Sequence, residues 1–279
     1  MSEVAAKKPA SNLALRVASA VVALPLILLL LFKGPPWGFF LLVLPAALLG
    51  AFELFAMTHP GDRLSQTLGV LLSAVATLTL YLFGQDVRVL TTVFVAIPVL
   101  GPLLTLVRLG DVKTAALRAL SLSSGPLFVA VPLTLLAVMR RDAGNDGPAF
   151  VVAALTFAWG ADTGGYFGGR FFGKHKLYEA VSPKKTVEGA LGGLLGAVIG
   201  ATIIHFLLLP TTPLWHLLGL AVVAGALGQA GDLGESLLKR SVGVKDSGAI
   251  VPGHGGILDR VDALLLTSTV VYLYTLWRH

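Results

Sequence analysis

Long apolar runs separated by short polar stretches follow one another along the whole chain. A helix needs about 20 mostly apolar residues to cross the hydrocarbon core of a bilayer. Prolines inside such runs are tolerated, because neighbouring helices supply partners for the carbonyls that a proline frees. The pattern predicts an all-α, polytopic membrane protein with about nine transmembrane helices, at Val17–Phe32, Trp37–Met57, Leu68–Phe83, Val89–Val107, Leu120–Val138, Ala149–Phe167, Ala190–Leu209, Leu214–Gly234 and Ile257–Trp277.

Lysine and arginine are divided unevenly between the two sides of this predicted bundle. Sixteen of the 21 fall on the side of the N-terminus and five on the other side. Because loops in the cytoplasm carry the excess of Lys and Arg, we expect a cytoplasmic N-terminus and a C-terminus on the opposite side. We interpret the first run as an uncleaved helix in the inner (cytoplasmic) membrane, since no small-residue cleavage site follows it.

The composition agrees with a membrane protein. Of the 279 residues, 55% are hydrophobic and 13% are charged, whereas a soluble domain has about 25% charged residues. These values exclude a soluble cytosolic enzyme and a disordered chain. The absence of cysteine excludes a disulfide scaffold, a thiolate metal site and a cysteine nucleophile. The formal charge of +6 reports membrane orientation and gives no reason to expect a nucleic-acid partner.

Polar residues are concentrated in two segments, 162–189 and 231–262. We find no internal repeat and no linker, so we interpret residues 1–279 as one domain. Residues 1–140 are expected to be mainly a membrane scaffold, with Glu53 as a lone acid in an apolar run. Residues 149–279 are expected to form the catalytic half, with its site facing the cytoplasm.

The segment 231–262 carries two pairs of acids. Asp232 and Glu235 are three residues apart, as are Asp259 and Asp262, so each pair shares a helix face. An acid at the membrane edge is costly and is by default a functional hypothesis. Two such pairs are suited to hard cations, which prefer oxygen ligands. The glycines between the pairs leave backbone N–H groups open to phosphate oxygens.

Plainer interpretations remain for each of these residues. Asp259 and Asp262 are equally explained as first-turn acids that stabilise a helix N-terminus. Glu235 is better explained by solvation or a salt bridge than by metal binding, and a lone histidine such as His254 is more often structural. The basic residues Lys239, Arg240 and Lys245 are also explained as membrane-orienting charges.

The segment 162–189 contains a stretch whose residue spacing is similar to that of a phosphate-binding loop. Gly168, Gly173 and Lys174 have the required spacing, but His175 replaces the Ser or Thr that would hold magnesium, so we reject that interpretation. The glycines here are also explained by close helix packing.

Ser182-Pro183 predicts an N-cap followed by proline at the first helical position. Lys184 and Lys185 would then oppose the dipole of that helix, which would make sense if its N-terminus binds an anion such as a triphosphate. The alternative is a basic cluster that only sets the orientation in the membrane.

Both segments resemble the phosphatidate cytidylyltransferase (CDP-diacylglycerol synthase) family. That family has a Ser, Lys-Arg and Lys-Asp pattern followed by Pro-x-His-Gly-Gly-x-x-Asp-Arg-x-Asp. The matching positions are Ser236, Leu238, Lys239, Arg240, Lys245, Asp246, Pro252, His254, Gly255, Gly256, Asp259, Arg260 and Asp262. Val251 departs conservatively from the Leu, Ile or Phe expected there. In the first segment the matches are Asp162, Thr163, Tyr166, Gly169, Arg170, Ser182, Pro183, Lys185, Thr186, Glu188 and Gly189.

The resemblance implies a reaction of CTP with phosphatidate, a membrane lipid, that gives CDP-diacylglycerol and pyrophosphate. It implies Mg²⁺ held mainly by Asp232 and Asp259, with Asp262 and Asp162 as lesser contributors, and leaves a second cation open. Phosphate contacts are expected from Lys239, Arg240, Lys245, Arg260, Lys184 and Lys185. The remaining site residues implied are Asp246, Ser236, Tyr166, Arg170, Ser182, Pro183, Thr186, Glu188, Gly189, His254, Gly255 and Gly256. Whether the protein forms a homodimer is left open by the sequence.

Two other functions compete with this interpretation. An ion-coupled transporter would have inverted repeats and polar residues near the midplane of several helices, whereas the acids here gather at one edge. A polyisoprenol kinase would also combine acids with basic loops, but it would attack the terminal phosphorus of CTP. A CDP-alcohol phosphotransferase is disfavoured, because its Asp-Gly-x2-Ala-Arg run is not found in this sequence.

Overall fold

The computed structural model describes residues 24–248 and 255–278. Residues 24–32 are helical, and the other elements follow in chain order. They are α2 (Pro36–Thr58), α3 (Arg63–Phe83), α4 (Val87–Val107), α5 (Val112–Gly125), a π-helical turn (Pro126–Ala130), α6 (Val131–Asp142), a short 3-10 turn (Gly144–Asp146), α7 (Gly147–Phe172), β1 (Lys176–Tyr178), β2 (Ser182–Thr186), α8 (Val187–Leu207), α9 (Leu214–Ser241) and α10 (Leu258–Trp277). Within the described residues the fold is therefore helical apart from one β-hairpin.

Six segments of the described chain are long and apolar enough to cross a membrane. They are α2, α3, α4, the continuous segment Val112–Asp142, α8 and α9. Each coincides with a predicted run, so the prediction of membrane-length helices is confirmed, and these helices are consistent with a polytopic membrane protein. Helices α7 and α10 also form where runs were predicted. The predicted run Leu120–Val138 contains Pro126 and is continuous from α5 to α6. The two helices are joined by the π-helical turn, in which the Val131 N–H donates to the Pro126 carbonyl. Part of the first predicted run lies outside the described residues.

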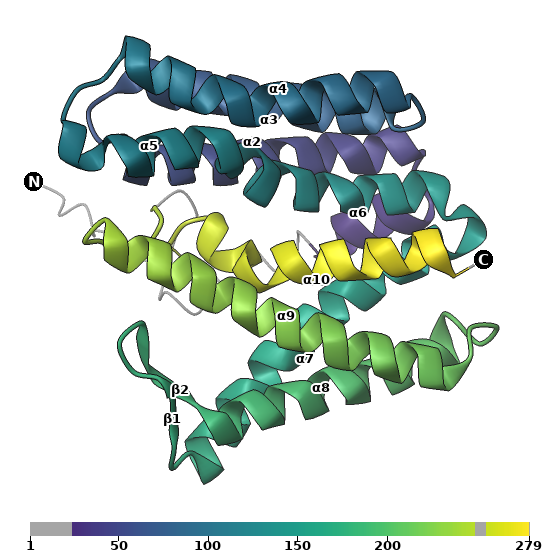
Figure 1. The fold of residues 1–279 in the computed structure, drawn as a ribbon. Coiled ribbons are helices and arrows are strands. Elements are labelled where there is room, and N and C mark those ends of the chain that lie inside the picture. The colour runs from purple at the N-terminus through teal and green to yellow at the C-terminus, as the bar shows by residue number, and fades with distance from the viewer. Residues whose placement is uncertain (1–23, 249–254, 279) are drawn as a thin grey trace, which may run out of the picture.

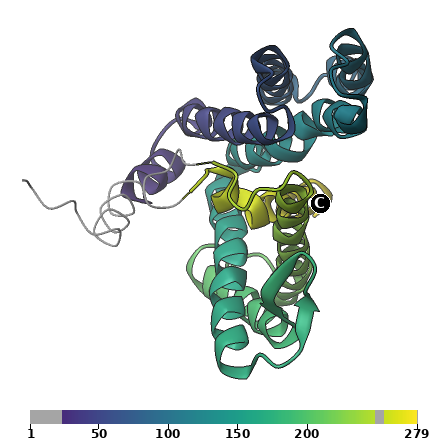
Figure 2. The ribbon, with the colours of Figure 1, turned by 90° about the vertical axis from the view of Figure 1, so that its left-hand side faces the viewer.

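The helices form two groups that meet along α6 and α10 (Figures 1 and 2). In one group, α2, α3, α4 and α5 contact one another in sequence order or close to it. In the other, α8 packs between α7 and α9, and α9 also contacts α10. Helix α6 touches α2, α3, α7 and α10 and so joins the groups.

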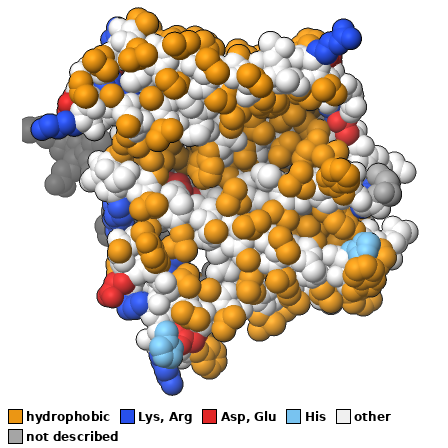
Figure 3. All heavy atoms as spheres, in the orientation of Figure 1, with side chains coloured by type: hydrophobic (Ala, Val, Ile, Leu, Met, Phe, Trp, Pro, Cys, Tyr) orange, Lys and Arg blue, Asp and Glu red, His pale blue; other side chains and the backbone are white. Residues whose placement is uncertain are grey.

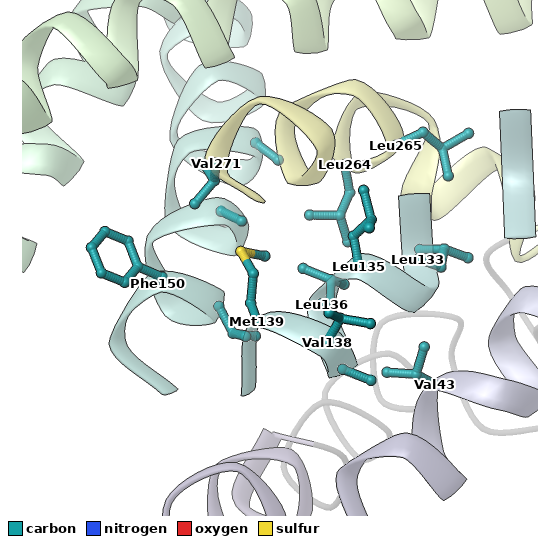
Figure 4. Packing of buried hydrophobic residues seen from close by; sticks show 14 of the residues in the cluster. Val43, Leu133, Leu135, Leu136, Val138, Met139, Phe150, Leu264, Leu265 and Val271 are labelled. Atoms are coloured by element: carbon teal, nitrogen blue, oxygen red, sulfur yellow. The ribbon is translucent and has the colours of Figure 1, made fainter. Parts of the chain in front are cut away.

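The central position of α6 explains its composition. Every residue from Pro132 to Met139 is buried, which is expected of a helix that is apolar on all sides. In Figure 4, side chains of α6 lie between Val43 of α2, Phe150 of α7 and Leu264 and Val271 of α10. The core of the molecule therefore lies at this junction, and both groups are anchored to it.

Small residues bring α7 and α8 unusually close. A Cβ atom added at Gly192 would lie 2.6 Å from the Gly164 carbonyl oxygen, and one added at Gly168 would lie 2.9 Å from the Glu188 carbonyl oxygen. Only glycine permits this approach, so the interpretation of these residues as helix-packing positions is confirmed. The close contact places the end of α7 beside the start of α8.

Apolar side chains cover most of the face in Figure 3, and charged side chains gather toward its ends. Figure 1 shows the hairpin, the end of α9 and the α4–α5 connection at one end of the bundle, with the C-terminus at the other. The two polar segments of the sequence therefore meet at one end of the helices.

The predicted helix start at Ser182-Pro183 is wrong. Residues Ser182–Thr186 form β2, which pairs antiparallel with β1, and α8 begins at Val187. Thr186 is the N-cap, and its hydroxyl accepts a hydrogen bond from the Gly189 N–H at 3.0 Å. A Thr with a free hydroxyl is a good N-cap, and proline is tolerated in an edge strand. Lys184 and Lys185 therefore lie on a strand, and the argument from the helix dipole fails.

Candidate functional site

A cavity of about 480 Å³ opens between α7, α8, α9 and the hairpin. Helix α7 and the hairpin contribute most of its polar lining, and α9 adds Asp232. The residues predicted from sequence that line it are Asp162, Tyr166, Arg170, Ser182, Lys184, Lys185, Thr186, Gly189 and Asp232. The fold thus brings together residues from both polar segments, such as Lys185 and Asp232, which are 47 positions apart in the sequence.

Two acids line this cavity, Asp162 on α7 and Asp232 on α9. Asp262 on α10 interacts electrostatically with both of them, and we call these three residues the cleft acids. Asp162 and Asp262 each interact electrostatically with Asp232, and they also interact with each other. The Nζ atom of Lys185 lies 2.6 Å from Oδ2 of Asp232. Lys185 and Arg260 both act on Asp162 as favourable positive charges. The site therefore combines three negative charges with cations that come from the hairpin and from α10.

A second and more buried acidic group surrounds Lys239 of α9. The Nζ atom of Lys239 forms ion pairs with Glu235, one turn earlier on the same helix, and with Asp259 of α10, where the distance to Oδ1 is 2.6 Å. The side chain of Glu235 is 0% exposed and that of Asp259 is 10% exposed. The interpretation of Glu235 as a salt-bridged residue is confirmed. Lys239 thus joins α9 to the first turn of α10.

Backbone groups satisfy the other oxygen of Asp259. Its Oδ2 accepts hydrogen bonds from the Ser247 N–H at 2.9 Å and the Gly256 N–H at 3.1 Å. The Gly256 N–H, which the sequence suggested for phosphate binding, is therefore engaged by a carboxylate. Asp259 lies in the first turn of α10, so the interpretation as a first-turn acid describes its position well.

The other predicted residues lie around these two groups. Glu188 accepts hydrogen bonds from the N–H groups of Lys174 and His175, at 3.0 and 3.2 Å, and does not line the cavity. Arg240 donates to the Val244 carbonyl at 3.1 Å. Ser236 is half-buried on α9, and Pro183, Lys245, Asp246 and Arg260 are exposed. Gly255 has a positive φ of 84°. His254, like Val251 and Pro252, lies outside the described residues.

The cleft acids are chemically suited to Mg²⁺. Among residues 24–248 and 255–278, no group of three His, Cys, Asp or Glu side chains is placed to hold a metal ion. Mg²⁺ does not need such a group, because it is usually bound by one or two carboxylates together with water and substrate phosphates. Oxygen donors with a surplus of negative charge, open to a cavity, fit that description.

The sequence model of the cytidylyltransferase family matches residues 14–277, almost the whole chain. The chain belongs to the cytidylyltransferase family. Its curated relatives include the phosphatidate cytidylyltransferases of Staphylococcus haemolyticus and Staphylococcus saprophyticus, each 46% identical over 121 residues. The enzyme of that name from Staphylococcus aureus (strain COL) is 44% identical over the same length. These matches cover 43% of this chain and 46% of each relative, so they span about half the length of both.

Two polar residues at or near the site were not assigned to it from the sequence. Gln229 lines the cavity from α9, and its side-chain amide donates to the Ala190 carbonyl at 3.2 Å. Glu53, from the part interpreted as scaffold, accepts hydrogen bonds from residues around Asp259. Gln229 lies one turn before Asp232, and this spacing is a signal that could have identified it. Glu53 stood out only as an acid in an apolar run.

Proposed function

We propose that this protein transfers CMP from CTP to phosphatidate, giving CDP-diacylglycerol and pyrophosphate. The observation that carries the proposal is the cavity in which Lys184, Lys185 and Arg170 face Asp162 and Asp232. A nucleotide triphosphate and a lipid phosphate are both polyanions, so their reaction needs cations on both sides of the reacting phosphorus. Membership of the family and the names of the curated relatives support the same reaction.

In the proposed reaction, a phosphate oxygen of phosphatidate attacks the α-phosphorus of CTP. A new P–O bond forms, and the bond from the α-phosphorus to the oxygen that bridges to the β-phosphorus breaks. Pyrophosphate leaves with that electron pair. A phosphate monoester carries a charge of about −1.5 to −2 at pH 7, so its oxygen needs no general base. The obstacle is the repulsion between the two anions and the charge that builds on pyrophosphate.

The chain's own residues would reduce that repulsion. Lys184, Lys185 and Arg170 line the cavity and would contact the phosphates through charge-assisted hydrogen bonds. Asp232, together with Asp262 or Asp162, would hold Mg²⁺ with the help of substrate phosphates, and the ion would neutralise charge on the reacting phosphates. Asp259, which the sequence suggested as a main Mg²⁺ ligand, has its oxygens engaged by Lys239, Ser247 and Gly256, and would support this arrangement from there.

The test is purified protein with phosphatidate, Mg²⁺ and CTP labelled at either the α- or the γ-phosphate. We expect the α-label to enter the lipid and the γ-label to leave as pyrophosphate. Transfer of the γ-label to a lipid would indicate a kinase, and no transfer of either label would contradict the proposed function. Phosphatidate omitted from the same mixture is the control.

We further propose nine transmembrane segments, a cytoplasmic N-terminus and a site that faces the cytoplasm. The support is the excess of Lys and Arg on the side of the two polar segments. Because the chain has no cysteine, single cysteines report each side cleanly. Glu179→Cys, in the hairpin turn, should react with an impermeant maleimide only from the cytoplasmic side. Asn145→Cys, in the α6–α7 connection, should react only from the opposite side; the reverse pattern would refute the orientation.

A further inference from the structure

Glu53 is an acid buried in the core of a membrane-type bundle. It lies on α2, in the half of the chain expected to be scaffold, and is 1% exposed. A buried carboxylate is costly unless hydrogen bonds compensate for the water that it loses. The partners that compensate Glu53 therefore indicate what it does.

Within the described part of the chain, the hydrogen bonds to Glu53 come from residues on both sides of the 249–254 stretch, between α9 and α10. Its Oε1 accepts from the Ile257 N–H at 3.0 Å. Its Oε2 accepts from the Leu258 N–H at 2.8 Å and from the Ser247 hydroxyl at 3.0 Å. One side chain of α2 thus holds residues on both sides of the 249–254 stretch.

Glu53 serves as the N-terminal cap of α10. The N-cap residue of that helix is Ile257, whose own side chain offers no hydrogen bond. The first N–H groups of a helix need acceptors, and a negative charge there is favourable. Glycines make room for the carboxylate: a Cβ added at Gly248 or Gly256 would lie 3.0 or 2.9 Å from its Cδ atom.

Ser247 connects this cap to Asp259. Its hydroxyl donates to Glu53, its N–H donates to Oδ2 of Asp259, and its Oγ accepts from the Asp259 N–H at 3.3 Å. Glu53 and Asp259 thus share Ser247 without touching each other. The orientation of the Asp259 carboxylate depends on a residue that Glu53 holds in place.

We propose that Glu53 is a positioning residue that sets the first turn of α10 and, with the supporting acid Asp259, the position of Asp262 for cation binding. This inference rests on the proposed function. Groups that orient metal-binding side chains typically change metal affinity or activity about 10- to 100-fold when they are replaced. The first half of the chain would then take part in the site through α2.

Two variants test this role. Glu53→Gln keeps the shape but turns one acceptor into a donor that faces N–H groups. Ser247→Ala removes the hydroxyl that connects Glu53 to Asp259, keeps the backbone N–H that donates to Asp259 and leaves Glu53 its two backbone partners, so it keeps the test informative if Glu53→Gln fails to fold. Ser73→Ala is the matched control, because Ser73 is also buried and its hydroxyl donates to the Gly69 carbonyl within its own helix.

Three measurements are made on each purified protein: melting temperature, Mn²⁺ affinity by electron paramagnetic resonance without substrates, and kcat and KM for CDP-diacylglycerol formation. We expect Glu53→Gln to weaken Mn²⁺ binding and lower kcat by about tenfold or more, with a smaller change in KM for phosphatidate. Ser247→Ala should show the same pattern at reduced size, and the double variant should cost less than the sum of both.

A fall in melting temperature with Mn²⁺ affinity and kcat at wild-type values would overturn the inference, since Glu53 would then act only on stability. A wild-type protein that makes no CDP-diacylglycerol would refute the proposed function instead. The Mn²⁺ titration would still test the positioning role in that case, because it needs no turnover.

Discussion

The cleft acids and the acids around Lys239 are all carboxylates, and on α9 and α10 members of the two groups lie three residues apart, but the groups differ in their partners. Asp162, Asp232 and Asp262 interact with one another, and Asp162 and Asp232 line a cavity. Glu235 and Asp259 share Lys239, and Asp259 also receives two backbone N–H groups. Two acids of the first group thus face a cavity, whereas the acids of the second group have a cation and N–H donors as partners inside the protein.

This difference separates two tasks. A surplus of carboxylate oxygen facing a cavity attracts a cation and, through it, phosphates. Acids that have a cation and N–H donors inside the protein cost less to bury, and they hold α9 against the start of α10. Substitutions in the two groups should therefore have different effects on activity and stability.

Asp232→Asn should have the largest effect on activity. It removes a carboxylate that would hold Mg²⁺, and metal stabilisation of a phosphoryl transition state is worth several kcal/mol. We expect CDP-diacylglycerol formation to fall about 1,000-fold, with little change in melting temperature, because the repulsion from Asp162 and Asp262 also falls. Initial rates and thermal unfolding check this; turnover within tenfold of the wild type would remove Asp232 from the proposed metal site.

Asp259→Asn should reduce both activity and stability. The variant should still insert and fold, but turnover should be nearly lost, because Lys239 and the start of α10 lose a charged partner. Loss of hydrogen bonds to a charged group costs about 2 kcal/mol. A melting temperature lower than that of Asp232→Asn, measured side by side, supports the division into two groups, and equal values would contradict it.

Lys185→Gln should weaken substrate binding at the cavity. Lys185 pairs with Asp232 and is available to a triphosphate, so its loss removes a charge-assisted hydrogen bond. We expect kcat/KM for CTP to fall about tenfold. Lys174→Gln is the matched control, since Lys174 does not line the cavity; an equal loss in both variants would mean that only the overall charge matters.

Glu188→Gln should have the smallest effect. Glu188 accepts backbone N–H groups of the turn before β1 and lies beside the cavity without lining it. We expect a slightly lower melting temperature and a KM for CTP within about threefold of the wild type. Steady-state kinetics decide this, and a large rise in KM would show that Glu188 contacts the nucleotide directly.

The helices and the family could be predicted from the sequence. Apolar runs of membrane length form helices in any arrangement, because backbone groups in lipid must be satisfied within the segment. The acidic and basic residues of both polar segments were also visible as a motif. The helix start near residue 183 was predicted wrongly, because Ser-Pro and Thr both signal an N-cap and only the pairing of β1 with β2 distinguishes them.

The sequence by itself determined which residues are apolar enough to form the bundle and which carry the charges for phosphate chemistry. Only the tertiary structure decided which acids face one another. Lys239 of α9 pairs with Asp259 of α10, and Glu53 of α2 bonds to α10 more than 200 residues later. Such pairs depend on how helices from distant parts of the chain pack, and no local pattern encodes that packing.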